Sequence, residues 1–298
     1  MSPSIRPLKV LQAALVAAAL AVTTAGCSNS TQAAGSATTT DKTVTIGVNP
    51  YDEVLASSYL WKDILEEEGY TVKLEQLDVA PLYSGVATGQ LDFFFGAVPL
   101  THKDYWDRFS KDFNVTGQWY DTLRQGVVVP EYSDAKTVAD LKSKSSEFGG
   151  KIIGIESGSG LMAQTKAALT KYDLSGYNLI EGSTPAMLAA LDRSIKNKEP
   201  VAVTLWQPHW AFQKYQLRLL DDPEGVYPPN DTFKVITSKK FAKNEDVTKR
   251  LARFHMTAEQ LQSLEIVINQ AGQGKEQDAV KAWIKDNQAA VDTWKSAS

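Results

Sequence analysis

The sequence predicts an α/β protein of two similar lobes, with a ligand in the cleft between the lobes. Strand-like apolar runs alternate with helical stretches over residues 43–98, and the same alternation returns over residues 151–205. Such alternation is typical of mostly parallel sheets covered by helices. Two further strand-like segments, residues 126–129 and 233–237, lie where the chain would cross to the second lobe and back.

The first lobe contains three predicted strands and two predicted helices. In chain order they are a strand at 43–48, a helix at 54–68, a strand at 70–77, a helix at 81–88 and a strand at 93–98. Gly69 and Gly89 end the two helices, because glycine readily adopts the left-handed conformation that often terminates a helix.

The second lobe repeats this order, and the last part of the chain is helical. The expected elements are a strand at 151–155, a helix at 161–172, a strand at 179–180, a helix at 185–196, a strand at 201–205 and helices at 247–255, 258–270 and 277–294. The crossing segments therefore assign residues 42–128 and 233–298 to lobe I. Residues 129–232 form lobe II.

A glycine turn in the second lobe predicts an anion site. The strand at 151–155 leads into Gly158, Ser159 and Gly160, and a helix follows from Leu161. Glycines let a ligand approach the backbone, and the free N–H groups and dipole of a helix N-terminus favour a carboxylate or phosphate. A plain tight turn is the simpler alternative.

The same letters also fit a dinucleotide-binding fingerprint. Gly158 to Ala163 reads G-x-G-x-x-A, and Glu181 follows at the end of the next strand-like run. The two interpretations require different cellular compartments, so the N-terminus decides between them.

The N-terminus predicts export and lipid attachment. Residues 1–26 begin with positive charges, continue with an apolar run too short to span a bilayer, and end in small residues before Cys27. This order is that of a lipoprotein signal peptide, with Cys27 as the lipid anchor and residues 27–41 as a flexible Ser/Thr/Ala/Gly tether. The alternative is ordinary secretion with an incidental cysteine. A protein on the extracytoplasmic face of the cell membrane would not meet a nicotinamide cofactor.

Composition excludes several other functions. The formal net charge is −4 and no basic stripe is visible, so no nucleic acid is expected as a partner. One cysteine allows neither an internal disulfide nor a cysteine zinc cluster, and His102 and His209 lack a third ligand at metal spacing. We therefore predict no metal and no cofactor. No nucleophile–base pair is recognisable, which disfavours an enzyme.

Residues that directly follow strands should face the cleft. They are Tyr51, residues 97–102, residues 158–161 and residues 206–210. Trp206 ends an apolar strand, and its indole there is suited to stacking on a cation. The alternative is that Trp206 is a core aromatic residue.

Several separate motifs carry a family resemblance over residues 44–294. They are D-V-A-P-L-Y-S-G-V-A-T-G-Q-L-D at 78–92, T-H-K-D-Y-W at 101–106, G-I-E-S-G-S-G-L-M at 154–162, T-L-W-Q-P-H-W at 204–210 and L-D-D-P at 220–223. In this order they resemble the glycine betaine-type substrate-binding proteins of ABC importers. The resemblance implies a two-lobed periplasmic-binding-protein fold of type II. It also implies a monomeric receptor for a small zwitterionic solute, with the transmembrane subunit of an ABC permease as partner.

The resemblance also implies a site with two halves. Backbone amides of Gly160 and Leu161, together with His102, would hold the carboxylate of a glycine betaine-like osmoprotectant. Trp206 and Tyr51 would enclose the trimethylammonium head by cation–π contact.

One wall of the family's tryptophan box departs from the pattern. The position of the missing tryptophan corresponds to Ala97 or Val98 in this sequence. Phe94 or Phe95 is expected to lean into the site instead. The vacated volume would admit a bulkier betaine. The remaining alternatives are a receptor for a small carboxylate or amino acid without a quaternary head, and an extracytoplasmic enzyme using the same cleft.

Overall fold

The structure is a computed structural model that describes residues 42–296. The predicted signal peptide (1–26), the predicted anchor Cys27 and the predicted tether (27–41) lie outside the described residues. Within residues 42–296, no helix combines the length and the apolar character needed to cross a membrane.

The described strands form one mixed sheet in the order β2-β1-β3-β9-β4-β7-β5-β6, with β8 beside β4. The strands are β1 (Thr43–Val48), β2 (Thr71–Gln76), β3 (Phe93–Ala97), β4 (Phe113–Pro130), β5 (Lys151–Ile153), β6 (Asn178–Ile180), β7 (Val203–Gln207), β8 (Leu217–Leu219) and β9 (Asp231–Ser238). Strand β1 is parallel to β2 and β3, and β5 is parallel to β6 and β7. These two parallel groups are the two β-α-β passes that the sequence predicts.

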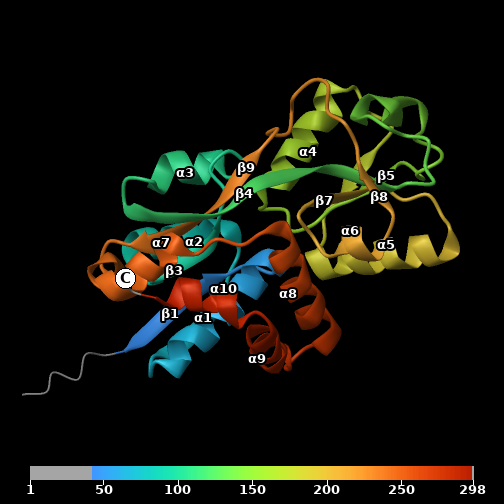
Figure 1. The fold of residues 1–298 in the computed structure, drawn as a ribbon. Helices are drawn as coiled ribbons and strands as arrows, with labels where there is room; N and C mark the ends of the chain where they lie inside the picture. The colour runs from blue at the N-terminus through green and yellow to red at the C-terminus, as the bar shows by residue number, and fades with distance from the viewer. Residues whose placement is uncertain (1–41, 297–298) are drawn as a thin grey trace, which may run out of the picture. The chain divides into compact units, whose positions relative to one another are not determined.

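The long strand β4 joins the two parallel groups. Residues 113–123 of β4 pair with β9, and residues 124–130 pair with β7 and β8. We call β1, β2, β3, β9 and residues 113–123 the first half of the sheet, and the remaining strands the second half. Figure 1 shows β4 and β9 running between the helices that accompany the two halves.

Only residues 126–129 of β4 were expected as a strand. The register against β9 shifts between Val115 and Gly117, again between Gln118 and Tyr120, and once more before Leu123. These irregularities interrupt the two-residue alternation of buried side chains by which a strand is recognised. The first part of β4 therefore lacks a readable period.

The helices agree with the predicted ranges except near the chain end and in two short segments. They are α1 (Asp52–Glu67), α2 (Val79–Thr88), α3 (Lys103–Phe109), α4 (Gly160–Lys171), α5 (Thr184–Asn197), α6 (Ala211–Lys214), α7 (Glu245–Arg253), α8 (Ala258–Ala271), α9 (Glu276–Asp286) and α10 (Gln288–Lys295), with 3-10 turns at Val138–Ser143 and Phe241–Lys243. The predicted helix at 277–294 is two helices, α9 and α10, that meet at Asn287. The short elements α3, α6 and β8 were not predicted.

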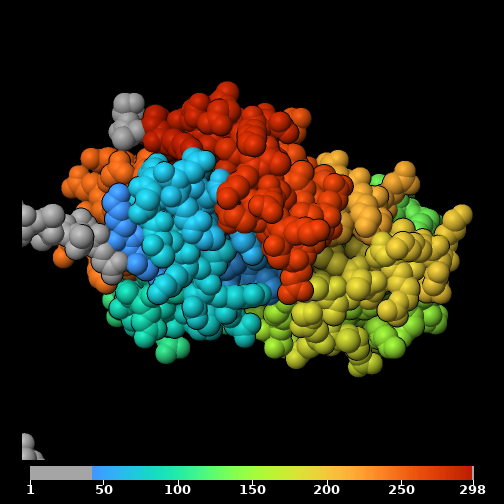
Figure 2. Space-filling view, turned by 90° about the horizontal axis from the view of Figure 1, so that it is seen from below, coloured from blue at the N-terminus to red at the C-terminus, as the bar shows by residue number. Residues whose placement is uncertain are grey.

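The chain end returns to the first half of the sheet. Helix α1 contacts α8 and α9, and Figure 2 shows the red C-terminal segment against the blue and cyan N-terminal segment. Buried Trp61 of α1 packs edge-on against Phe254, which follows α7. These contacts fix α1, and the first turn of α1 carries residues of the candidate site.

Candidate functional site

A cavity lies where the ends of β1, β3 and β7, the middle of β4 and the start of β9 approach the start of α4. Its lining residues are Tyr51, Glu53, Gly96, Val98, Thr101, His102, Leu123, Gln125, Ile155, Ser159, Gly160, Leu161, Trp206 and Phe233. Five of the predicted site residues are among them: Tyr51, His102, Gly160, Leu161 and Trp206. The cavity draws on both halves of the sheet, as expected for a site beyond the carboxyl ends of parallel strands.

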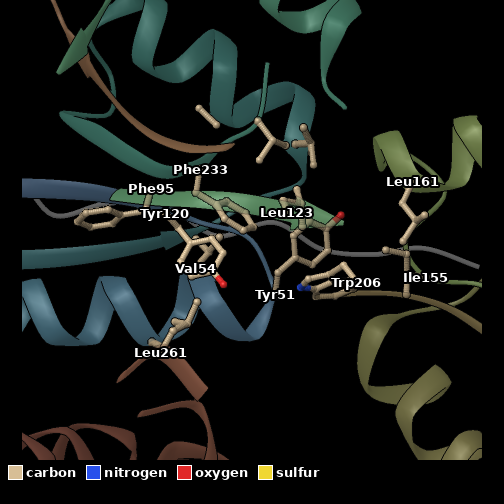
Figure 3. Close-up of a cluster of buried hydrophobic side chains, with 14 of the residues drawn as sticks. Tyr51, Val54, Phe95, Tyr120, Leu123, Ile155, Leu161, Trp206, Phe233 and Leu261 are labelled. Carbon is tan, nitrogen blue, oxygen red and sulfur yellow. The ribbon is translucent and has the colours of Figure 1, made fainter. Parts of the chain in front are cut away.

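Tyr51 and Trp206 form an aromatic pair on one wall of the cavity. Their ring centroids are 5.4 Å apart and the ring planes are inclined by 57°. Tyr51 directly precedes α1 in an extended conformation, and Trp206 is near the end of β7. Figure 3 shows the two rings side by side, with Leu123 close to Tyr51 and with Ile155 and Leu161 approaching from the second half. Two tilted ring faces beside one cavity can hold a cation.

The first turn of α4 forms a polar part of the cavity wall. The Ser159 side chain caps the helix by accepting a hydrogen bond from the Met162 N–H at 3.2 Å. That cap does not use the N–H groups of Gly160 and Leu161, the first two residues of the helix. These amides can donate hydrogen bonds to an anionic group, and the positive end of the helix dipole also favours one.

His102 is a neutral, oriented side chain on the same cavity. It is 4% exposed, and burial lowers its pKa to about 3. The Tyr83 hydroxyl lies 3.3 Å from Nδ1 of His102, so this hydroxyl can donate to that nitrogen. With Nδ1 as the acceptor, the proton of the neutral imidazole is on Nε2. A neutral imidazole with its N–H at Nε2 can donate one hydrogen bond to a carboxylate.

Phe94 and Phe95 do not line the cavity, so the expectation that one of them leans in is wrong. Strand β3 lies between β1 and β9 and is buried along its whole length, so both of its faces belong to the core. Phe94 packs against Tyr83, and Phe95 packs against residues of the core such as Trp119. In Figure 3, Phe95 lies away from Trp206, on the far side of Tyr120.

Phe233 is the aromatic side chain that the sequence interpretation missed. It is 3% exposed, lies on β9, and stacks on Trp119 with a centroid distance of 5.1 Å. The sequence marks residue 233 as part of a crossing strand, but no local pattern says that this strand passes the cavity. Val98 also lines the cavity, whereas Ala97 does not.

Polar residues of the cavity wall were missed as well. Gln125 Nε2 donates to Thr101 Oγ1 at 2.8 Å and to Gln164 Oε1 at 2.6 Å, which connects the two halves of the sheet. Gln125 lies in the part of β4 that was not recognised as a strand. Glu53 lies two residues after Tyr51, in the first turn of the helix. An acidic residue shortly after the end of a strand is the sequence signal that could have identified Glu53.

His209 occupies a different place from His102. It is fully buried, its Nε2 lies 2.9 Å from Asp52 Oδ2, and its Nδ1 accepts a hydrogen bond from the Ala211 N–H. Over residues 42–296, no group of three or more His, Cys, Asp or Glu side chains is arranged to hold a metal ion.

Known proteins resemble the chain over most of its length. Residues 42–286 match the family described as the substrate binding domain of ABC-type glycine betaine transport systems. The glycine betaine/carnitine transport binding protein GbuC of Listeria monocytogenes is 36% identical over 146 residues. That match covers 48% of this chain, and the chain spans about half the length of this curated relative.

Two solved structures share both fold and sequence with the chain. Lactococcal OpuAC, in a closed conformation complexed with glycine betaine, superposes with a TM-score of 0.80 at 33% identity, covering 86% of this chain and 100% of the other. ProX from Borrelia burgdorferi, a glycine/betaine/L-proline-binding protein, superposes with a TM-score of 0.80 at 29% identity, covering 85% and 96%. The fold is therefore the periplasmic-binding-protein fold that the resemblance implied. The matched family consists of transport binding domains rather than enzymes. The chain belongs to the family of substrate-binding domains of ABC-type glycine betaine transport systems.

Proposed function

We propose that the chain captures a small solute with a quaternary ammonium head and a carboxylate, of the glycine betaine type. It then delivers the solute to the transmembrane subunit of an ABC permease. The observation that carries this proposal is that the Tyr51–Trp206 pair and the first turn of α4 line one cavity. A zwitterion of this kind needs an aromatic wall at one end and N–H donors at the other.

The cationic head would lie against the ring faces of Tyr51 and Trp206. A trimethylammonium group has no N–H to donate, so its attraction to a binding site comes from aromatic faces and from negative charge. A desolvated cation–π contact contributes about 2 kcal/mol. Phe233, Leu123 and Val98 would surround the methyl groups, because all three line the same cavity.

The carboxylate would accept hydrogen bonds from the Gly160 and Leu161 N–H groups and from Nε2 of His102. Hydrogen bonds to a charged group contribute roughly 1.5–3 kcal/mol each. Gly160 suits this role because its backbone is not shielded by a side chain.

The named relatives support this choice of solute. GbuC is described as binding glycine betaine and carnitine, and the lactococcal structure contains glycine betaine. We also propose that residues 42–128 with 233–298 and residues 129–232 act as two lobes that close on the solute. The change of strand partners between residues 123 and 124 of β4 lies near that boundary.

Attachment to the membrane completes the proposal. Cys27 would carry lipid on the extracytoplasmic face of the cell membrane, and residues 27–41 would tether a monomeric receptor near its permease. The short apolar run before Thr24, Ala25, Gly26 and Cys27 supports this anchoring.

Calorimetric titration with a solute panel tests the function. The panel contains glycine betaine, proline betaine, carnitine, choline and L-proline. We expect the quaternary ammonium carboxylates to bind more tightly than L-proline, which lacks the methylated head. Tighter binding of L-proline or another plain amino acid would favour the alternative receptor function. Chemical change of the recovered solute would point to an enzyme.

A further inference from the structure

Glu53 is a buried acid in the wall of the solute cavity. It belongs to the first turn of α1, is 2% exposed, and lines the cavity together with Tyr51 and Trp206. Its Oε2 accepts a hydrogen bond from Nε1 of Trp206 at 2.9 Å. The aromatic residue best suited to face a cation is thus bonded through its edge to a carboxyl group.

Among the described residues, no lysine or arginine lines this cavity with Glu53. Asp52 on the same helix and Glu265 on α8 are acidic neighbours, and both interact unfavourably with an ionised Glu53. His209 lies against Asp52, and His102 across the cavity is neutral because burial lowers its pKa to about 3. Burial raises the pKa of Tyr51, so its side chain remains a neutral phenol.

These surroundings favour the protonated form of Glu53. Burial is the largest cause, and the charge of Asp52 adds to it. The hydrogen bonds from the helix backbone and from Trp206 oppose the shift only in part, so the pKa of Glu53 is raised to about 8. A cation placed beside the carboxyl group reverses the preference, because an opposite charge at short range stabilises the ionised form.

We propose that Glu53 is the counter-ion of the cationic head, and that binding of a quaternary ammonium solute expels the proton of Glu53 into solution. The neutral carboxyl group loses one proton, and the resulting carboxylate remains beside the bound cation. The inference rests on the proposed function and deepens it, because it adds a negative group to the aromatic wall. It also makes solute affinity depend on pH in a defined direction.

The sign of that dependence follows from linkage. Below the pKa of about 8, binding must remove a proton, so affinity rises with pH by up to about tenfold per pH unit. Above that pKa, Glu53 is already ionised and the affinity no longer changes. A cavity without this acid would bind the same solute with a flat pH profile.

Calorimetry with glycine betaine in two buffers of different ionisation enthalpy measures the released proton. At pH 6.5 the wild-type protein should release close to one proton more than a Glu53→Gln variant, and at pH 9.5 the difference should vanish. Glutamine keeps an oxygen that can accept the Trp206 hydrogen bond but cannot ionise. If His102 takes up a proton when the carboxylate docks, both proteins show it, and the difference still isolates Glu53.

Asp63→Asn is the matched control. Asp63 is a buried acid of the same helix, but it accepts a hydrogen bond from Gln277 and does not line the cavity. This variant should keep the wild-type proton release and the wild-type pH profile. Thermal unfolding checks that each variant is folded. If Glu53→Gln does not fold, the affinity and proton release of the wild-type protein, measured from pH 6 to pH 9.5, test the proposal by themselves.

Two results separate this inference from the proposed function. Glycine betaine binding with no proton release and equal affinity at pH 6.5 and pH 9.5 overturns the role of Glu53 and leaves the function intact. Proton release that is unchanged in Glu53→Gln also overturns the role of Glu53 and leaves the proposed function intact. If no quaternary ammonium solute binds even at pH 9.5, the proposed function fails and this inference fails with it.

Discussion

The carbonyl oxygen of Thr101 faces Gly160 so closely that a Cβ atom on Gly160 would lie 2.2 Å from it. Thr101 follows β3 in the first half of the sheet, and Gly160 begins α4 in the second half. Glycine at this position therefore lets the two halves meet beside the cavity.

A Gly160→Ala substitution should push the halves apart at this contact. Backbone atoms cannot move aside as a flexible side chain can, so we expect a cost of about 1–3 kcal/mol, or roughly fivefold to 150-fold weaker solute binding. Calorimetric titration with glycine betaine measures the loss. Gly158→Ala is the control, because nothing lies within 4 Å of a Cβ atom there. Equal affinity in the two variants would contradict the contact.

The indole N–H of Trp206 should matter separately from its ring. Trp206→Phe keeps an aromatic face but leaves Oε2 of Glu53 without its donor, so we expect about tenfold weaker binding. Trp206→Ala should lose about 2 kcal/mol more with the ring face. Trp283→Phe removes a comparable indole donor, bonded to Ser263 at 2.8 Å, away from the cavity. A Trp206→Phe protein that binds as tightly as Trp283→Phe would refute the role of the N–H group.

Phe233 should control solute size. Phe233→Ala removes an aromatic side chain from the wall, so glycine betaine should bind about tenfold more weakly. The affinity for carnitine should rise relative to the affinity for glycine betaine. Competition titrations with the two solutes give the order of preference. Phe95→Leu changes a core phenylalanine outside the cavity and should lower the melting temperature without changing the order. An unchanged order in Phe233→Ala would remove Phe233 from the site.

His102 should make the protein less stable in acid. The pKa of His102 is lowered to about 3 in the folded state by burial, below its ordinary value of 6.5. Its stabilising contribution is therefore complete above pH 6.5 and decreases as the pH falls toward 3, by at most about 1.4 kcal/mol per pH unit. Urea unfolding at pH 7 and pH 4.5 should show a smaller loss for His102→Gln than for wild type.

The histidine control for that experiment is His255, whose side chain is 48% exposed. His255→Gln should show the wild-type loss of stability between the two pH values. If His102→Gln also shows the wild-type loss, the imidazole of His102 is not held neutral by the fold.

Cys27 should hold the protein at the membrane. Cell fractionation should find the wild-type protein in the membrane fraction and a Cys27→Ala variant in the soluble extracytoplasmic fraction. The lipid on Cys27 is the proposed attachment, so loss of the modified cysteine should release the chain. Retention of the variant in the membrane fraction would contradict lipid attachment.

Local sequence determined most of the elements and part of the site. Apolar runs such as residues 43–48 and helix ends such as Gly89, which has a φ of 76°, are set by interactions within a few residues. The glycine turn at 158–160 likewise identified the start of α4. Tyr51, His102, Gly160, Leu161 and Trp206 could be named together because each follows a strand or begins a helix, and the motif resemblance assigned them to one site.

Only the tertiary structure decided which side chains complete the cavity wall. Trp206 and Glu53 are separated by 153 positions in the chain, and their hydrogen bond depends on how β7 meets the start of α1. Phe233 replaced Phe94 and Phe95 as the aromatic neighbour because β9 passes the cavity while both faces of β3 are covered. A local pattern reports whether a residue is buried, but burial beside a cavity and burial in the core produce the same pattern. The distinction arises from the pairing of strands far apart in the chain, which the period of any one strand does not encode.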